Sequence, residues 1–120
     1  MSRLDQSVPD DEKAALLSLL KALKPFRELR KTMPLQYVTA FLSVANKEGQ
    51  NVTEYAKLVG TSQSLMTRHL ADIGKINRYH KPGYGLVEAE TDMMDRRNQL
   101  IYLTAKGQRL VGQLLGALDK

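Results

Sequence analysis

The sequence predicts a mainly α-helical fold of the α+β class, and two stretches of the chain carry this prediction. Residues 53–73 read as two short helices joined by a tight turn at Gly60. Residues 86–103 read as two strands whose connecting tip holds Arg96 and Arg97. A helix–turn–helix followed by an arginine-tipped hairpin forms a winged helix–turn–helix, a unit that reaches into a DNA groove and grips beside it.

Composition bounds the class of protein. The 120 residues fit one domain, and 42% hydrophobic residues are enough for a compact core. The chain has no cysteine, which excludes disulfides, thiolate metal sites and cysteine nucleophiles. It has no apolar run long enough to span a membrane and no apolar signal core, so we expect a cytoplasmic protein without membrane contact. A net charge of +5 favours a polyanionic partner.

The N-terminal part predicts a flexible tail over residues 1–9 and a single folded domain over residues 10–120. A first helix opens on three carboxylates that suit the positive end of the helix dipole, Asp10, Asp11 and Glu12. Its leucines form a broad apolar stripe, and Pro25 is expected to end it.

A second helix is predicted from about Thr32, with Pro34 in its first turn. Its expected buried face consists of Val38, Phe41, Leu42 and Ala45. In the helix–turn–helix, Thr53 is the expected cap of a third helix whose inward residues are Ala56, Leu58 and Val59.

A fourth helix follows Gly60, capped by Thr61 or Ser62 and running to about Ile73. Met66, Leu70 and Ile73 are its expected core contacts. Residues 74–85 read as a basic loop and residues 86–103 as the wing. Thr104 is the expected cap of the last helix, residues 104–118.

The outer face of the fourth helix carries the strongest functional signal. Its side chains are short polar donors and one arginine, groups that read base edges and phosphates in the major groove. A solvated face would be the alternative, but such faces usually carry Glu and Lys, and no acid occurs between Thr61 and Ala71. The candidate residues are Thr61, Ser62, Gln63, Ser64, Thr67 and Arg68.

The wing and the preceding loop supply further candidate contacts. Asp95 can pair with one of the two following arginines and fix its direction, while the other extends toward a phosphate or a narrow minor groove. Tyr79 and Tyr84 alternate with basic residues and either line a DNA backbone or pin the loop to the body. The candidates are Lys75, Arg78, Lys81, Asp95, Arg96 and Arg97.

The two histidines indicate neither a catalytic site nor a metal site. His69 lies beside apolar positions, which favours a structural histidine at the edge of the core. His69 and His80 would need further ligands to hold a metal, and the loop offers no convincing set. We therefore expect no enzyme activity, no metal and no cofactor.

From Met33 to about Val111 the chain resembles the MarR family of winged helix–turn–helix regulators. The matching motifs are Leu58-Val-Gly-Thr-Ser-Gln-Ser-Leu-Met-Thr-Arg, Gly85-Leu-Val, Asp95-Arg-Arg and Leu103-Thr-Ala-Lys-Gly107. The resemblance implies a dimeric repressor or activator, with the helix from Thr61 in the major groove and Arg96 or Arg97 in the minor groove. It leaves a small-molecule effector undetermined.

The first and last helices are expected to be dimerisation helices, because they show more apolar surface than a small winged core needs. The alternative is that they pack on each other within one subunit. Two-fold symmetry predicts a pseudo-palindromic site. The expected interface residues are Leu16, Leu19, Leu20, Leu23, Leu110, Leu114, Leu115 and Leu118.

These observations together predict a sequence-specific regulator of transcription that binds double-stranded DNA, of the dimeric repressor type. Two alternatives stay open at this point. One is a DNA-binding accessory factor of replication, partition or a mobile element, and the other is a winged helix that binds protein.

Overall fold

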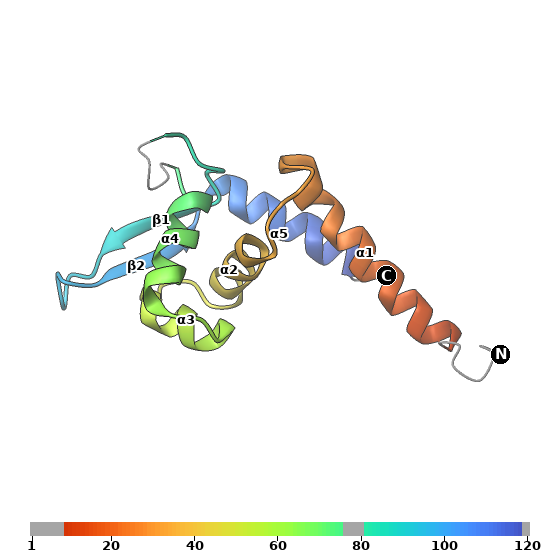
Figure 1. The fold of residues 1–120 in the computed structure, drawn as a ribbon, viewed down its shortest axis with the longest axis horizontal. Helices are drawn as coiled ribbons and strands as arrows, with labels where there is room; N and C mark the ends of the chain where they lie inside the picture. The colour runs from red at the N-terminus through yellow and green to blue at the C-terminus, as the bar shows by residue number, and fades with distance from the viewer. Residues whose placement is uncertain (1–8, 76–80, 119–120) are drawn as a thin grey trace.

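Five helices and one two-stranded antiparallel sheet make up the part of the chain described by the computed structural model, residues 9–75 and 81–118 (Figure 1). This arrangement confirms the predicted α+β winged helix–turn–helix fold. Most of the predicted N-terminal tail lies outside the described residues. The elements are α1 Asp10–Leu29, α2 Leu35–Asn46, α3 Val52–Val59, α4 Gln63–Ile73, β1 Val87–Thr91, β2 Gln99–Leu103 and α5 Ala105–Leu118.

Helix α1 continues past Pro25 for another turn, so the prediction that this proline ends the helix was wrong. A proline inside a helix loses one backbone hydrogen bond and crowds the preceding turn. Burial of the following turn offsets that cost. Phe26 is only 3% exposed and meets the edge of Phe41 at a ring-centroid distance of 5.8 Å, and Leu29 packs against the same core.

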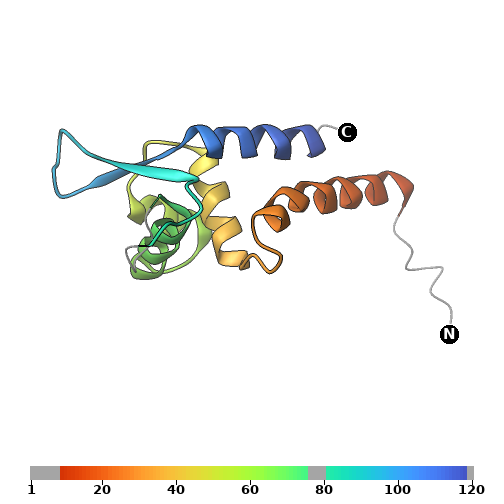
Figure 2. The ribbon, with the colours of Figure 1, turned by 90° about the horizontal axis from the view of Figure 1, so that it is seen from above.

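Helices α1 and α5 run antiparallel, side by side, at the end of the molecule opposite the wing (Figure 2). The N-terminal half of α1 projects beyond the rest of the body (Figure 1). The chain is accordingly elongated, with extents of 59 × 26 × 25 Å.

Helix α2 forms the centre of the core, where Ala40, Phe41 and Val44 are fully buried. It begins at Leu35 with Pro34 at the N-cap position, slightly later than predicted. Leu42 was expected to be buried but is 44% exposed, because the inward stripe centres on Phe41 and Leu42 lies beside it.

Helix α3 differs from the prediction in its cap and its inward face. Asn51, not Thr53, caps the helix, and its Oδ1 accepts the Glu54 N–H at 3.0 Å. Leu58 is 59% exposed, because Tyr55 and Ala56 occupy the inward side. The Tyr55 hydroxyl donates to the Lys47 carbonyl oxygen at 2.6 Å, and burial raises the pKa of this tyrosine.

The wing strands pair in register from Val87↔Leu103 to Thr91↔Gln99, which confirms the predicted hairpin. Thr104 then caps α5 as predicted, because its Oγ1 accepts the Gly107 N–H at 3.0 Å. The same hydroxyl donates to the Gly85 carbonyl oxygen at 2.6 Å. The first turn of α5 is thereby held against the chain that enters the wing.

Gly107 lies where α5 approaches the backbone most closely. A Cβ atom at this position would overlap the carbonyl oxygen of Leu86, whereas a Cβ at Gly112 in the same helix would meet nothing within 4 Å. We expect Gly107→Ala to destabilise the fold by about 1–3 kcal/mol through overpacking. Gly112→Ala is the matched control, expected to stabilise by roughly 0.5–1 kcal/mol through helix propensity.

Urea unfolding of both variants measures these effects as shifts of the midpoint. Equal midpoints for the two variants would show that the close approach of α5 to Leu86 does not constrain position 107.

Candidate nucleic-acid interface

The turn between α3 and α4 has the geometry that a helix–turn–helix requires. Gly60 has φ 87°, a left-handed conformation that is cheap only for glycine. The N–H groups of Gly60 and Thr61 both donate to the Ala56 carbonyl oxygen, at 2.8 and 3.0 Å. Met66 is fully buried at the helix crossing, where Ala56 is 4% exposed. These contacts fix the direction of α4 relative to the body.

Two of the predicted contact residues, Ser62 and Thr67, use their hydroxyls in hydrogen bonds to the backbone of α4. The Ser62 hydroxyl caps the helix by accepting the Leu65 N–H at 3.1 Å. The Thr67 hydroxyl donates to the Gln63 carbonyl oxygen at 2.9 Å. Thr61 is half-buried in the turn. These residues therefore position the helix and have less freedom to read bases.

The exposed polar side chains of α4 that make no hydrogen bond to the described backbone are those of Gln63, Ser64 and Arg68. Leu65 is exposed beside them. Ser64 lies 3.4 Å from the Ser62 hydroxyl. Gln63 and Arg68 use no side-chain hydrogen bond or ion pair to any other described residue. An amide and a guanidinium of this kind can form paired hydrogen bonds with adenine and guanine edges.

At the tip of the wing, Asp95 pairs with one of the two arginines and not with the other, as the sequence predicted. Asp95 accepts two hydrogen bonds from the Arg97 guanidinium, at 3.0 Å from Nε and 3.1 Å from Nη2. This pairing holds the pKa of the Asp95 carboxyl below its usual range, so the pair persists into mildly acidic solution. Arg96 is exposed and contacts no acid within the described ranges. It is the guanidinium left available to an external anion.

The basic loop is only partly described. Lys75 forms an ion pair with Glu88, with 3.8 Å between Nζ and Oε2, so part of its charge is already balanced. Lys81 is exposed. Arg78, Tyr79 and His80 lie outside the described residues.

Tyr84 favours the interpretation in which the loop is pinned to the body. Its ring meets the edge of Tyr37 at 6.2 Å, and its carbonyl oxygen accepts the Lys106 ammonium at 2.7 Å. His69 also packs against Tyr37, at 6.0 Å between ring centroids, and is half-buried. That position agrees with a structural histidine at the edge of the core.

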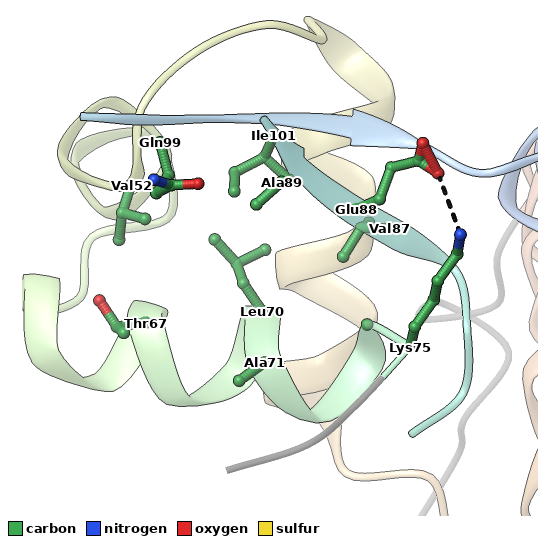
Figure 3. A pocket seen from close by; sticks show the side chains of 11 residues that line it. Val52, Thr67, Leu70, Ala71, Lys75, Val87, Glu88, Ala89, Gln99 and Ile101 are labelled. Carbon is green, nitrogen blue, oxygen red and sulfur yellow. Dashed lines mark ion pairs between the residues drawn. The ribbon is translucent and has the colours of Figure 1, made fainter. Parts of the chain in front are cut away.

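A pocket of about 550 Å³ separates α4 from the wing (Figure 3). Val87, Ala89 and Ile101 line it from the sheet, and Leu70 and Ala71 from α4. Its polar groups stand at the rim, with Thr67 on α4 facing Gln99 on β2 and the Lys75–Glu88 pair at one end (Figure 3).

Gln99 is a polar side chain at this interface that sequence reasoning missed. Its Nε2 donates to the Thr91 hydroxyl at 3.3 Å, next to the wing tip. Strand alternation gave the available signal, because positions 99 and 101 of β2 share one face and Ile101 is buried against the body.

The predicted dimer residues fall into two groups. Leu110 and Leu114 are each 5% exposed, because α5 packs on α1 within the same subunit. They belong to the core of the chain, so the prediction that they form a dimer interface was wrong. The other six remain exposed: Leu16, Leu19, Leu20, Leu23, Leu115 and Leu118.

Two other kinds of site find no support in residues 9–75 and 81–118. No group of three or more His, Cys, Asp and Glu side chains is placed to hold a metal ion there. No helix within these residues is long and apolar enough to cross a membrane.

The comparisons with known proteins give matches among solved structures alone. No protein-family model and no curated protein matches the chain. The transcriptional regulator Tm0710 of Thermotoga maritima matches with a TM-score of 0.69 at 16% identity, over 90% of this chain and 69% of that one. A MarR-like regulator of the same organism matches with a TM-score of 0.63 at 26% identity, over 94% and 77%. The chain has the fold of the MarR-type regulators.

A third match is the repressor CouR, solved on a 23-mer DNA duplex. It has a TM-score of 0.56 at 21% identity, over 100% of this chain and 78% of that one. These three proteins are regulators of transcription. The MarR-type fold therefore extends over the winged helix and both terminal helices of this chain.

Proposed function

We propose that this protein is a sequence-specific, double-stranded DNA-binding regulator of transcription that acts as a homodimer, in the manner of a MarR-type repressor. The observation that carries the proposal is the outer face of α4. This face presents Gln63, Ser64 and Arg68 to solvent and carries no acid. The repressor CouR, which has a similar fold, was solved bound to DNA.

In this proposal α4 enters the major groove and its exposed amide and guanidinium read base edges. The Ser62 cap leaves the N-terminus of α4 at the surface, where the helix dipole favours a phosphate. Arg96 enters the neighbouring minor groove, while Arg97 is directed by its pairing with Asp95. We thus assign base reading to α4, and backbone or minor-groove contacts to the wing.

The acids of the wing do not oppose this orientation. Ala89 and Ile101 line the pocket facing α4, so alternation places Glu90 on the opposite face of β1. Glu88 is turned to Lys75 at the pocket rim. The surface between α4 and the wing therefore presents apolar and neutral polar groups, and Glu88 at its rim is paired with Lys75.

A second copy of the chain is the proposed partner of the terminal helices. The exposed leucines on α1 lie on a helix that projects beyond the body (Figure 1). Leu20 is 62% exposed and Leu115 on the adjacent α5 is 60% exposed. A two-fold axis through this surface would bury both stripes and place two α4 helices for a pseudo-palindromic site.

A DNA-binding accessory factor of replication or partition would use the same surface, so its distinction from a regulator depends on where the site lies in the genome. A protein-binding winged helix makes a different physical prediction. Because DNA binding through several phosphate contacts releases counterions, its affinity must fall steeply as salt rises.

Variants of the wing test this proposal more specifically than the salt dependence of the wild-type protein does. Replacing Arg96 and Arg97 together with alanine is expected to lower affinity across many duplex sequences. The slope of log affinity against log salt should flatten by roughly one to two units, since about that many phosphate contacts are lost. Fluorescence anisotropy over a salt series measures both quantities.

Arg109→Ala is a control that removes one arginine charge from the exposed face of α5, and it is expected to leave the slope unchanged. A double variant with the wild-type slope would show that the wing does not touch DNA. Wild-type affinity without salt dependence would instead contradict the proposed function itself.

A further inference from the structure

The tip of the wing exposes two adjacent methionines that the proposed base readers and arginines leave unexplained. Met93 is 78% exposed and Met94 is 94% exposed, the highest value among the large exposed hydrophobic residues of the described chain. They sit in a five-residue loop, 93–97, closed by the Asp92 N–H and the Asn98 carbonyl oxygen at 3.0 Å. The same loop carries Arg96.

The loop is held in shape by its own polar groups. Asp92 Oδ1 accepts the Met94 N–H at 2.9 Å, which fixes the turn that bears both thioethers. Asp95 Oδ1 accepts the Arg97 N–H at 3.1 Å, and its carboxylate also holds the Arg97 guanidinium. Both methionines are therefore presented on a turn whose backbone is already ordered, which lowers the entropy lost on binding.

The charges around the methionines favour a DNA groove over a membrane surface as the partner. Asp92, Asp95, Arg96 and Arg97 sum to zero, so the tip has no cationic excess for an anionic membrane surface. Its charge is arranged unevenly, since Asp95 is paired with Arg97, and Arg96 contacts no acid among the described residues. A guanidinium without an acid partner, beside apolar side chains, matches a minor groove, which offers negative potential at its walls and stacked bases at its floor.

We propose that Met93 and Met94 form an apolar wedge that enters the minor groove beside Arg96 and partly unstacks one base step. This inference rests on the proposed function. It adds a preference for particular base steps that does not depend on hydrogen bonds to the bases. Unstacking is cheapest at pyrimidine–purine steps such as TA, so the wedge favours a flexible step where the wing meets the DNA. The wing then contributes to sequence selection through deformability, while α4 contributes through base edges.

The test compares two double variants on one duplex, the site that the wild-type protein selects from a random pool. Replacing both methionines with alanine removes the wedge, whereas replacing both with leucine keeps the apolar volume. The alanine variant is expected to lose about tenfold in affinity, or ~1.4 kcal/mol, with an unchanged salt slope. The leucine variant should stay within about twofold of wild type.

A 2-aminopurine placed at the step facing the wing reports unstacking directly. Its fluorescence should rise when the wild-type or the leucine variant binds, and stay flat with the alanine variant. Changing that step from TA to AA should weaken the wild-type complex but leave the alanine complex nearly unaffected, since the protein and DNA changes remove one shared interaction.

Three results would overturn the wedge. The first is an alanine variant that binds and brightens the probe as wild type does. The second is a loss of affinity accompanied by a flatter salt slope, which would trace the effect to Arg96. The third is a lower sedimentation mass for the alanine variant, which would make the methionines a contact between subunits. In each case wild-type binding to the selected duplex would leave the proposed function standing.

Discussion

Arg68→Ala is expected to weaken binding to the selected duplex by about 1–3 kcal/mol while leaving binding to scrambled DNA nearly unchanged. The reason is the position of the side chain. Met66 and Leu70 are buried and fix the rotation of α4, which leaves Arg68 exposed on the outer face. A guanidinium there can form two hydrogen bonds with a guanine, and alanine leaves that base edge unpaired.

Anisotropy titrations on the selected and the scrambled duplex measure the two losses separately. Arg109→Ala removes the same charge from α5 and should leave the ratio of the two affinities unchanged. Equal losses on both duplexes for Arg68→Ala would assign this residue to the DNA backbone and contradict its role as a base reader.

Leu20→Asp should convert the proposed dimer to a monomer. Leu20 is 62% exposed in the single subunit, so the fold tolerates a charge there, but a buried unpaired carboxylate in an apolar interface is costly. Sedimentation at micromolar concentration should show the wild type at twice 13.5 kDa and the variant at 13.5 kDa.

Loss of the dimer also predicts weaker DNA binding. A monomer contacts one half-site and loses the effective concentration of the linked second subunit, a factor of about 10²–10⁴. Leu35→Asp is the matched control, since Leu35 is 70% exposed outside the two terminal helices and should leave the mass unchanged. A wild-type protein that sediments at 13.5 kDa would contradict the proposed interface.

Local sequence signals predicted the site scaffold well because each depends on a single residue type. Gly60 adopts a positive φ, Ser62 caps α4 and Thr104 caps α5, all roles that backbone geometry restricts to few residues. The Asp95–Arg97 pair was predictable for a similar reason, since a carboxylate two residues before a guanidinium in a tight turn lies within its reach.

Tertiary packing decided the features that the sequence did not reveal. Pro25 is expected to end a helix on local grounds, yet burial of Phe26 carries α1 through it. Leu110 and Leu20 look alike as members of apolar stripes, and only the packing of α1 on α5 shows that the first is core and the second is surface. The spacing of apolar residues cannot distinguish a helix face that packs within its own subunit from one that is exposed on the subunit surface.

The polar face of α4 shows the same limit on a smaller scale. Ser62 and Thr67 have the composition of groove-reading residues, but their hydroxyls are bound to Leu65 N–H and the Gln63 carbonyl oxygen. Hydrogen-bond partners within the helix are set by its exact start, which sequence patterns locate only to within a few residues. Among the six candidates we therefore propose Gln63, Ser64 and Arg68 as the base readers.

Selection of binding sites from a pool of random duplex DNA measures whether this protein recognises a specific sequence. We expect enrichment of a pseudo-palindrome whose half-sites are centred about one helical turn, 34–36 Å, apart. The selected site should bind at least about 10³-fold more tightly than scrambled DNA at physiological salt. A pool that shows no enriched sequence, bound no more tightly than random duplex, would contradict sequence-specific regulation by this protein.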